Sequence, residues 1–424
     1  MSADDSREVA TKRQRSAALD QTSRADLWFY PGEVLADGEM RITLMGTGWG
    51  DVVRPDQKGP SLFVELGNPA RDSFVFDVGP GCILNYNALG VPRSRMNPIF
   101  LSHLHMDHCS DLPFIYGFGP KAGDRFAPLQ LHGPSGPDGL GLKHLVEGMR
   151  KFTDWHVTSF KTVVMGCEAS YLLTDENVHE FPYHLNCGVA YERHGPEHGH
   201  IVVKHFPALH IIDGAVSYRR EWTPPDSHET LVFVYSGDTL PNEFMIEHGR
   251  GADILIHETA PALESLTTAL AMPADQALGI VCNSHTPASM LGEILRRTRP
   301  GLGVTTHSPV NHQSLDYFIR EVRAKWKGPY QLGADFMVFN IWRDQCGDRQ
   351  ITTRMAAPLG RCWPVDIETT ESTQTPLDAV NYQTASLFDK AMYSEVCQAF
   401  KDGSDTAGSG GGGGERRGDD GGES

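Results

Sequence analysis

The sequence predicts an α/β protein whose strands end in potential metal ligands. Short apolar runs recur along the chain and end in glycine turns or in histidine and aspartate, which is typical of buried strands with polar residues at one edge. A helix is predicted to begin near Pro287, between two such runs. The most informative segment is His103-Leu104-His105-Met106-Asp107-His108, which directly follows the apolar run 98–102.

Three imidazoles and one carboxylate in this cluster predict a metal site. Each imidazole needs a hydrogen-bonding or metal partner, so the cluster is a poor hydrophobic core. Imidazole nitrogen and carboxylate oxygen suit Zn²⁺, with Mn²⁺ or Fe²⁺ as alternatives. In the H-x-H-x-D-H spacing, His103 and His105 can hold one ion while Asp107 and His108 face a second. The cluster therefore predicts half of a two-metal hydrolase site.

Three strands are predicted before the cluster, at residues 42–48, 61–66 and 74–81. The first closes in Gly46-Thr47-Gly48-Trp49-Gly50, which does not match a dinucleotide-binding loop, because the third glycine of G-x-G-x-x-G would fall at Asp51. We interpret these glycines as positions where the backbone packs tightly beneath the metal site.

The cluster resembles the signature of the metallo-β-lactamase superfamily, and matching segments extend over about residues 40–312. Asp238 ends the apolar run 232–236 and resembles the aspartate that bridges both metals in that superfamily. The structural alternative is that Asp238 caps a helix, since Pro241 just after it would suit the first turn of that helix. His307 follows the run 304–306 and resembles the last ligand of the second metal. The resemblance implies an αββα sandwich of two facing sheets, with all ligand loops at one edge.

The remaining ligand of the first metal is ambiguous, because several histidines lie between the cluster and Asp238. The resemblance places this ligand just before a glycine-tyrosine-arginine strand, which favours His210 and leaves His205 as the runner-up. The full set implied by the resemblance is His103, His105 and His210 for the first metal, Asp107, His108 and His307 for the second, and Asp238 between them.

Two further segments resemble the ribonuclease Z branch, which also has arylsulfatase-like members. His257-Glu258-Thr259-Ala260 is similar to the His-Glu-Ala-Thr segment of that branch, with the last two residues interchanged, and Ser284-His285-Thr286 is similar to its His-x-Thr segment. The resemblance implies that Glu258 and His285 handle the proton of the leaving group. The structural alternative is that Ser284 or Thr286 caps the helix near Pro287, with His285 incidental.

The implied mechanism is hydrolysis by a metal-bridging hydroxide, since two metals lower the pKa of water. Asp107, Glu258 and His285 are the predicted catalytic residues, and Glu258 with His285 supplies the general acid. The leading hypothesis is a two-zinc hydrolase of small phosphate, sulfate or related esters. The alternatives are ribonuclease Z-type processing of the 3′ end of precursor transfer RNA, and a non-catalytic metal-binding member of the fold.

The charge balance bears on the choice of partner. The chain has 37 basic and 54 acidic residues, a formal charge of −17. Because nucleic-acid affinity comes mainly from neutralising phosphates, this balance argues against nucleic acid without excluding it, and favours a small ester. Only Arg219-Arg220 and the cluster 296–299 offer seeds for a basic patch, and no copy of the protruding transfer-RNA arm of the ribonuclease branch is found.

The predicted organisation is a polar N-terminal segment 1–28, a hydrolase domain 29–330, a C-terminal extension 331–402 packed on the core, and a disordered glycine-rich tail 403–424. The domain carries a long insertion at about 143–204. Within it, the histidine-rich stretch 193–200 is predicted to be a mobile loop. The extension is predicted to contain a hairpin turning at 346–348 and a helix over 385–401.

Eight scattered cysteines and the lack of a signal-peptide-like segment predict reduced thiols in a cytoplasmic protein. Cys109, next to the cluster, is predicted to pack behind the metal loop. No apolar run is long enough to span a membrane. The sequence leaves a homodimer open.

Overall fold

The structure is a computed structural model that describes residues 28–29, 33–50, 53–123, 125–164, 166–184, 187–269, 271–310 and 314–356. The predicted helix over 385–401, the glycine-rich tail 403–424 and residues 1–27 of the N-terminal segment lie outside these ranges. Of the predicted C-terminal extension, residues 331–356 are described.

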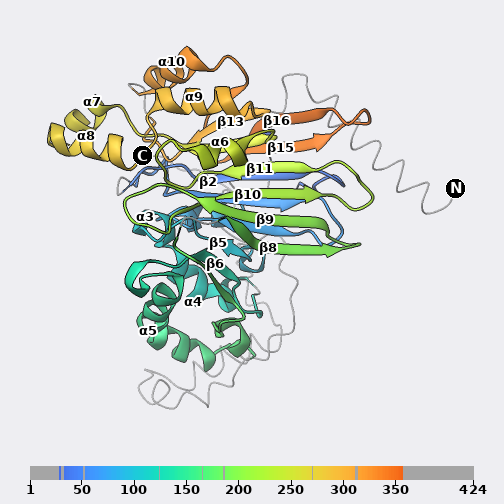
Figure 1. The fold of residues 1–424 in the computed structure, drawn as a ribbon. Coiled ribbons are helices and arrows are strands. Elements are labelled where there is room, and N and C mark those ends of the chain that lie inside the picture. The colour runs from blue at the N-terminus through green and yellow to red at the C-terminus, as the bar shows by residue number, and fades with distance from the viewer. Residues whose placement is uncertain are drawn as a thin grey trace, which may run out of the picture. The chain divides into compact units, whose positions relative to one another are not determined.

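The described strands form two sheets, seen nearly edge-on in Figure 1. The first sheet has the order β1-β16-β15-β2-β3-β4-β5-β6-β7. Its strands are β1 (Trp28–Phe29), β2 (Met40–Gly46), β3 (Ser61–Leu66), β4 (Ser73–Phe76), β5 (Ile99–Phe100), β6 (Leu131–Pro134), β7 (Val178–Phe181), β15 (Met337–Arg343) and β16 (Arg349–Ala356).

The second sheet has the order β14-β13-β12-β11-β10-β9-β8. Strands β11 to β14 run parallel to one another, so their carboxyl ends share one edge. Its strands are β8 (Gly188–Gly195), β9 (Gly199–Pro207), β10 (Val216–Thr223), β11 (Leu231–Tyr235), β12 (Ile254–Glu258), β13 (Leu302–Thr306) and β14 (Tyr330–Leu332).

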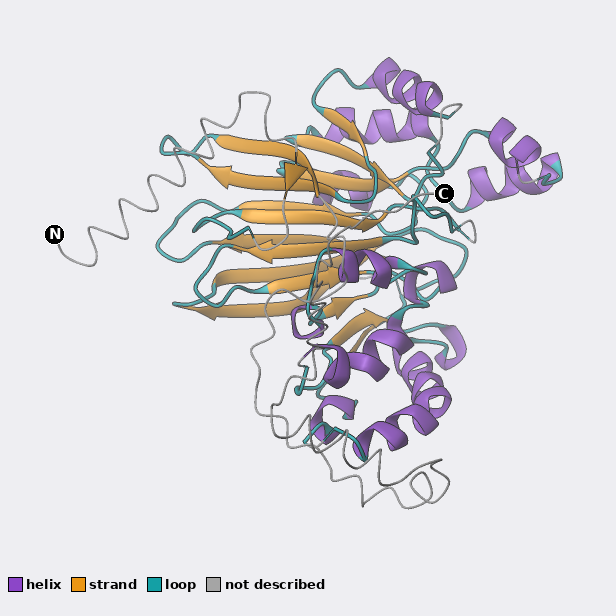
Figure 2. Ribbon diagram, turned by 180° about the vertical axis from the view of Figure 1, so that it is seen from behind, coloured by secondary structure: helices purple, strands orange, loops and turns teal. Residues whose placement is uncertain are grey.

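Helices lie on the outer faces of both sheets (Figures 1 and 2). The helices are α2 (Cys82–Ala88), α3 (Met106–Cys109), α4 (Leu112–Gly123), α5 (Leu142–Lys161), α6 (Glu243–Gly249), α7 (Leu263–Ala269), α8 (Ala274–Asn283), α9 (Ala288–Thr298) and α10 (Leu315–Lys325). Short 3-10 turns occur at Arg93–Arg95, Pro137–Gly139 and Glu168–Tyr171.

Three hydrophobic clusters separate four layers. One cluster fills the space between the sheets, a second joins the first sheet to α2, α4 and α5, and a third joins the second sheet to α6, α9 and α10. The alternation along β3 shows the cause: Leu62 and Val64 face the other sheet, while Phe63 faces the helices. This is the predicted αββα sandwich.

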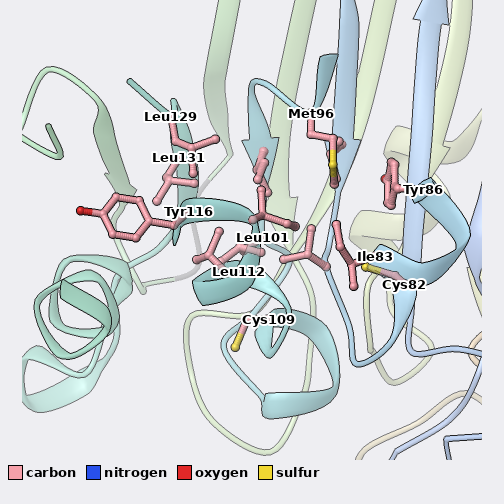
Figure 3. Packing of buried hydrophobic residues seen from close by; sticks show 14 of the residues in the cluster. Cys82, Ile83, Tyr86, Met96, Leu101, Cys109, Leu112, Tyr116, Leu129 and Leu131 are labelled. Carbon is pink, nitrogen blue, oxygen red and sulfur yellow. The ribbon is translucent and has the colours of Figure 1, made fainter. Parts of the chain in front are cut away.

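The first helical layer holds the metal loop from behind. Leu101, at the end of β5, packs with Leu112 of α4 and Ile83 of α2 in this layer (Figure 3). Cys109 belongs to the same cluster and its thiol approaches the carbonyl of His105, at 3.2 Å. Burial raises the pKa of Cys109 to about 12, so this thiol stays protonated and packs as an apolar group.

The segment predicted as an insertion is built into both sheets. It supplies α5, the edge strand β7 and the pair β8–β9, and β9 lies between β8 and β10. The prediction of a mobile loop at 193–200 is wrong, because these residues form the tight hairpin between β8 and β9. The hairpin has a physical signal, Gly199 at φ +72°, where any Cβ would overlap the carbonyl of Thr223.

The predicted C-terminal hairpin is present as β15 and β16, and Gly347 at φ +81° occupies its turn. Strand β15 pairs with β2, so this part of the extension belongs to the first sheet. The cysteines within the described ranges are all free thiols. Within the same ranges, no helix combines the length and the apolar character needed to cross a bilayer.

Candidate active site

The predicted site residues gather at one edge of the sandwich, and most of them lie where a strand ends. The cluster 103–108 follows β5, Asp238 follows β11, and His307 follows β13. Glu258 is the last residue of β12, and His210 lies in the connection from β9 to β10. His285 comes from the loop between α8 and α9. The structure brings all of these side chains together.

The first group consists of His103, His105 and His210. The Nδ1 atom of His105 lies 3.0 Å from Nε2 of His103 and 3.2 Å from Nε2 of His210. His210 donates its Nδ1 proton to the carbonyl of Ser284 at 2.7 Å, which leaves the Nε2 lone pair directed at the group. Burial lowers the pKa of His210 to about 4, so the ring stays neutral, as a metal ligand must.

The second group consists of Asp107, His108, Asp238 and His307. Nε2 of His307 lies 3.1 Å from Asp107, and Nε2 of His108 lies 3.2 Å from Oδ1 of Asp238. Within the described residues, His108 Nε2, Asp238 Oδ1 and His307 Nδ1 are buried and accept or donate no hydrogen bond. Three buried polar atoms left facing one another fit a metal ion, because their desolvation would otherwise be uncompensated.

Asp238 lies between the two groups. Its Oδ1 faces His108 and, at 3.4 Å, Nδ1 of His307, whereas its Oδ2 is 3.8 Å from Nε2 of His103 and 3.9 Å from Nε2 of His210. The helix-cap alternative for Asp238 is wrong, because α6 is capped by Asn242, whose side chain accepts from the Met245 amide at 2.8 Å.

A glutamate and a histidine adjoin these groups as a hydrogen-bonded pair. Oε1 of Glu258 lies 3.1 Å from Nδ1 of His285 and also accepts from the Thr239 amide at 2.8 Å. Burial alone would lower the pKa of His285, but the Glu258 carboxylate outweighs it and raises that pKa to about 9. Burial raises the pKa of Glu258 despite His285. A proton is therefore stored in this buried pair.

The helix-cap alternative for the neighbours of His285 is also wrong. Ser284 donates its hydroxyl back to Ile280 of α8, and Thr286 donates its hydroxyl to the carbonyl of Thr239. Helix α9 begins after Pro287 with no side-chain cap. The Ser284 hydroxyl thus belongs to the end of α8, and the Thr286 hydroxyl fixes the loop that carries His285; neither caps α9.

His205, the runner-up for the first group, lies elsewhere. Its ring stacks on Phe181 at a centroid distance of 4.2 Å and an interplanar angle of 7°, on the side of β9 that faces the sandwich interior. Residues of β9 alternate between faces, and the loop after β9 carries His210 instead to the ligand edge.

Sequence reasoning missed Asp77, which supports the second group from behind. This fully buried carboxylate lies 2.8 Å from Nδ1 of His108 and accepts from the Ser102 amide and hydroxyl and from the Tyr235 hydroxyl, each at 2.7 Å. Such a partner fixes the ring orientation and makes Nε2 of His108 a stronger ligand. The signal was available, because Asp77 ends an apolar strand, just as Asp238 does.

The glycine turn after β2 lies beside the site. A Cβ at Gly46 would overlap the carbonyl of Gly59, and one at Gly48 would press on the carbonyl of Lys58, so the predicted close backbone packing is present. Trp49 follows, with its ring centroid 5.9 Å from that of His285 and 6.4 Å from that of His307. Helices α7 and α8 pack on the other side of Trp49.

Ribonuclease Z sequences are among the known proteins similar to this chain. No family model matches the chain. Ribonuclease Z of Mycobacterium bovis is 25% identical over 280 residues, which cover 63% of this chain and 85% of the relative. Ribonuclease Z of Haloarcula marismortui is 25% identical over 324 residues, which cover 70% of this chain and 96% of the relative.

Solved structures of lower identity were also found. A metallo-β-lactamase fold protein of Bacillus subtilis is 18% identical, with a TM-score of 0.47 and coverage of 71% of this chain and 99% of that chain. The short form of human tRNase Z is 18% identical, with a TM-score of 0.47 and coverage of 70% and 98%.

Two facing sheets, helices on both outer faces and a ligand cluster at one edge define a metallo-β-lactamase fold. Within that class, the sequence is related to ribonuclease Z. The chain is a metal-dependent hydrolase acting on ester bonds.

Proposed function

We propose that this chain is a two-metal phosphodiesterase of the ribonuclease Z type, which cleaves the 3′ end of precursor transfer RNA. The observation that carries the proposal is the position of Asp238, with one carboxylate oxygen facing each histidine group and the Glu258–His285 pair alongside. Sequence similarity to ribonuclease Z supports the choice of RNA as substrate.

The donor set assigns a residue to each metal. His103, His105 and His210 would hold the first ion, Asp107, His108 and His307 the second, with Asp238 shared. Neutral imidazoles and carboxylates are typical ligands of Zn²⁺. The three buried atoms without a hydrogen bond, His108 Nε2, Asp238 Oδ1 and His307 Nδ1, are available to coordinate the second ion. We propose zinc, with Mn²⁺ or Fe²⁺ as substitutes. When bound, these ions supply Lewis acidity, which lowers the pKa of water and offsets charge on the phosphoryl group.

Glu258 and His285 would then supply the proton that the leaving group needs. His285, protonated through its pairing with Glu258, would donate a proton to the departing oxygen, and Glu258 would hold the ring in that orientation through Nδ1. The amides of Thr239 and Thr286 keep Oε1 of Glu258 in place. Asp77 holds His108, and the carbonyl of Ser284 holds His210, so ligands from separate loops stay aligned.

The test is cleavage of a precursor transfer RNA carrying a 3′ trailer by purified, zinc-loaded protein. We expect a single cut at the trailer junction that leaves a 3′ hydroxyl on the transfer RNA, and loss of the cut in Asp238→Ala. A protein that hydrolyses aryl phosphodiesters but leaves the precursor intact would contradict the RNA part of the proposal and leave the metal chemistry standing.

A second candidate, a hydrolase of small phosphate, sulfate or related esters, has its own observation. The segments that carry the ligand candidates, Glu258 and His285 contain no lysine or arginine: residues 96–120, 205–218, 221–249, 251–295 and 300–319. In the glycine-turn loop beside them, Arg54 and Lys58 donate to backbone carbonyls of the protein. A polyanion is held by such side chains, so their absence from these segments favours a small substrate.

The two predicted seeds of a basic patch are already engaged in the structure. Arg220 is fully buried, with its guanidinium 4.8 Å from the ring centroid of Phe74, and Arg219 pairs with Glu221. Arg296 pairs with Glu293. Kinetics on bis-aryl phosphodiesters, aryl sulfates and precursor transfer RNA, compared as kcat/KM, decide between the candidates: a preference for the small diester selects the second.

A further inference from the structure

Asp335 ties three separate segments together beneath the site. Its side chain is buried, and it comes from the segment just before β15, in the C-terminal extension. One oxygen accepts from the Thr47 amide at 2.9 Å and from the Thr47 hydroxyl at 2.8 Å. The other accepts from the Lys58 amide and from the Asn85 side chain, both at 2.9 Å. Four donors thus satisfy a buried carboxylate that has no cationic partner among them.

Thr47 and Lys58 are the two ends of the loop that holds the glycine turn. The amide of Gly48 donates to the carbonyl of Lys58 at 2.6 Å, and Trp49 continues from there to the rings of His285 and His307. By fixing both Thr47 and Lys58, Asp335 sets the position of this turn.

The same loop is hydrogen-bonded to Ser308, the residue after His307. The Ser308 amide donates to the carbonyl of Thr47 at 3.0 Å, and the side chain of Gln57 donates to the carbonyls of both Ser308 and Thr47. These hydrogen bonds to Ser308 bear on His307, which has φ +49°. Non-glycine residues adopt this left-handed conformation rarely, and mainly where the surrounding structure holds them in it.

We propose that Asp335 is a positioning residue for the second metal, holding His307 in its left-handed conformation through Thr47, Gln57 and Ser308. Its hydrogen-bond partners are Thr47, Lys58 and Asn85, none of which is a ligand candidate. The inference rests on the proposed function, because His307 is a ligand only if the second group binds a metal. It also gives the C-terminal extension a role in the site, since this segment completes the ligand edge from below.

The test compares Asp335→Asn with Asp253→Asn in the full-length, zinc-loaded protein. Asp253 is the control, because it is another buried carboxylate that accepts several hydrogen bonds: from the Val232 amide at 2.7 Å, from Arg343 at 2.8 Å and from Arg349. It precedes β12 and so lies at the end of that strand away from Glu258. The readouts are metal content after dialysis against graded chelator, and the thermal unfolding midpoint.

In Asp335→Asn one carboxylate oxygen is replaced by an amide NH₂ group, which cannot accept from the donors that face it. The hydrogen bonds that fix Thr47 and Lys58 are therefore weakened. We expect the second zinc to be released at 10- to 100-fold lower chelator strength, the range typical for loss of a ligand's supporting partner, with the first zinc unchanged. Asp253→Asn should lower the unfolding midpoint and keep both metals. If Asp335→Asn does not fold, Thr47→Val removes one of the hydrogen-bond donors to Asp335. This variant should show the same selective loss of the second zinc, smaller in size.

Retention of both metals with wild-type affinity in Asp335→Asn, or equal loss of both metals in the two aspartate variants, would overturn the positioning role while leaving the two-metal site intact. Wild-type protein that binds only one zinc would instead overturn the proposed function, and the positioning role with it.

Discussion

Asp238 is the carboxylate that lies between the two histidine groups. Its two oxygens face histidines on opposite sides, and neighbouring His108 and His307 hold the pKa of this carboxyl well below its usual value against the effect of burial. In the proposed site, an ionised carboxylate at this position would offset the charge of both cations.

Replacement of Asp238 by alanine should abolish hydrolysis and reduce bound zinc towards about one ion per chain, because a shared ligand is lost. The measurement is metal content by mass spectrometry alongside turnover of a bis-aryl phosphodiester. Asp213→Ala, an exposed carboxylate in the loop after His210, serves as the control and should change neither. Full activity with two ions in Asp238→Ala would refute the shared-ligand assignment.

Alanine variants of Glu258 and His285 should keep both metals and lose turnover. The loss should be about 10²- to 10⁴-fold for a poor leaving group such as an alkoxide, the usual contribution of a general acid. It should be much smaller for nitrophenolate, which departs without a proton. Equal losses on both substrates would show that His285 acts only through the structure of the loop.

At the scale of elements, strand β9 and the loop behind it divide two histidines between two environments. His205 faces the sandwich interior and stacks on Phe181, while His210 leaves the strand and reaches the ligand edge. Only four residues of chain thus lie between a packing histidine and a candidate ligand.

Exchange of each histidine for leucine should separate these roles. His210→Leu should lower zinc content, whereas His205→Leu should keep both metals. Zinc content and activity of the two purified variants provide the measurement. Loss of metal in His205→Leu alone would reverse the assignment.

His205 should also make stability depend on pH. Burial lowers its pKa from 6.5 to about 4, so between these values the unfolded chain binds a proton that the folded chain does not. The stability that depends on neutral His205 is present above pH 6.5 and is lost as pH falls towards 4. Urea unfolding at pH 7 and pH 5 should therefore show a smaller drop in His205→Leu than in wild type, and equal drops would contradict this account.

At the scale of the whole molecule, the formal charge is −17 and the segments with the ligand candidates lack basic residues, which bears on the proposed RNA substrate. Association with a polyanion weakens with salt in proportion to the phosphates neutralised. Under the proposed function, we therefore expect RNA binding with a shallow dependence on salt.

A single added lysine at the site should change RNA binding measurably. Ile211 is 68% exposed next to His210, so Ile211→Lys should tighten binding of precursor transfer RNA and steepen its salt dependence by about one unit in the log–log slope. Val189→Lys, on β8 and 56% exposed, is the control and should have little effect. Binding measured by filter retention at several salt concentrations gives the slopes, and identical slopes in the two variants would place RNA elsewhere on the surface.

The sequence by itself determined the fold class and the candidates for the site. The strands predicted at 61–66, 74–81 and 232–236 are present as β3, β4 and β11, because alternating or continuous apolar runs have few other stable arrangements. The candidate metal ligands at strand ends could be found in the same way, because each is a polar residue at the point where an apolar run stops.

Only the tertiary structure decided what depends on contacts between distant segments. It brought His210 rather than His205 to the edge, excluded the two helix caps, and showed Asp77 behind His108 and Asp335 beneath the glycine turn. It also built the stretch predicted as an insertion into both sheets. The local sequence pattern shows which face of a strand is apolar. It does not show which distant carboxylate accepts a hydrogen bond from a given histidine, because that partner is determined by how the strands and loops pack together.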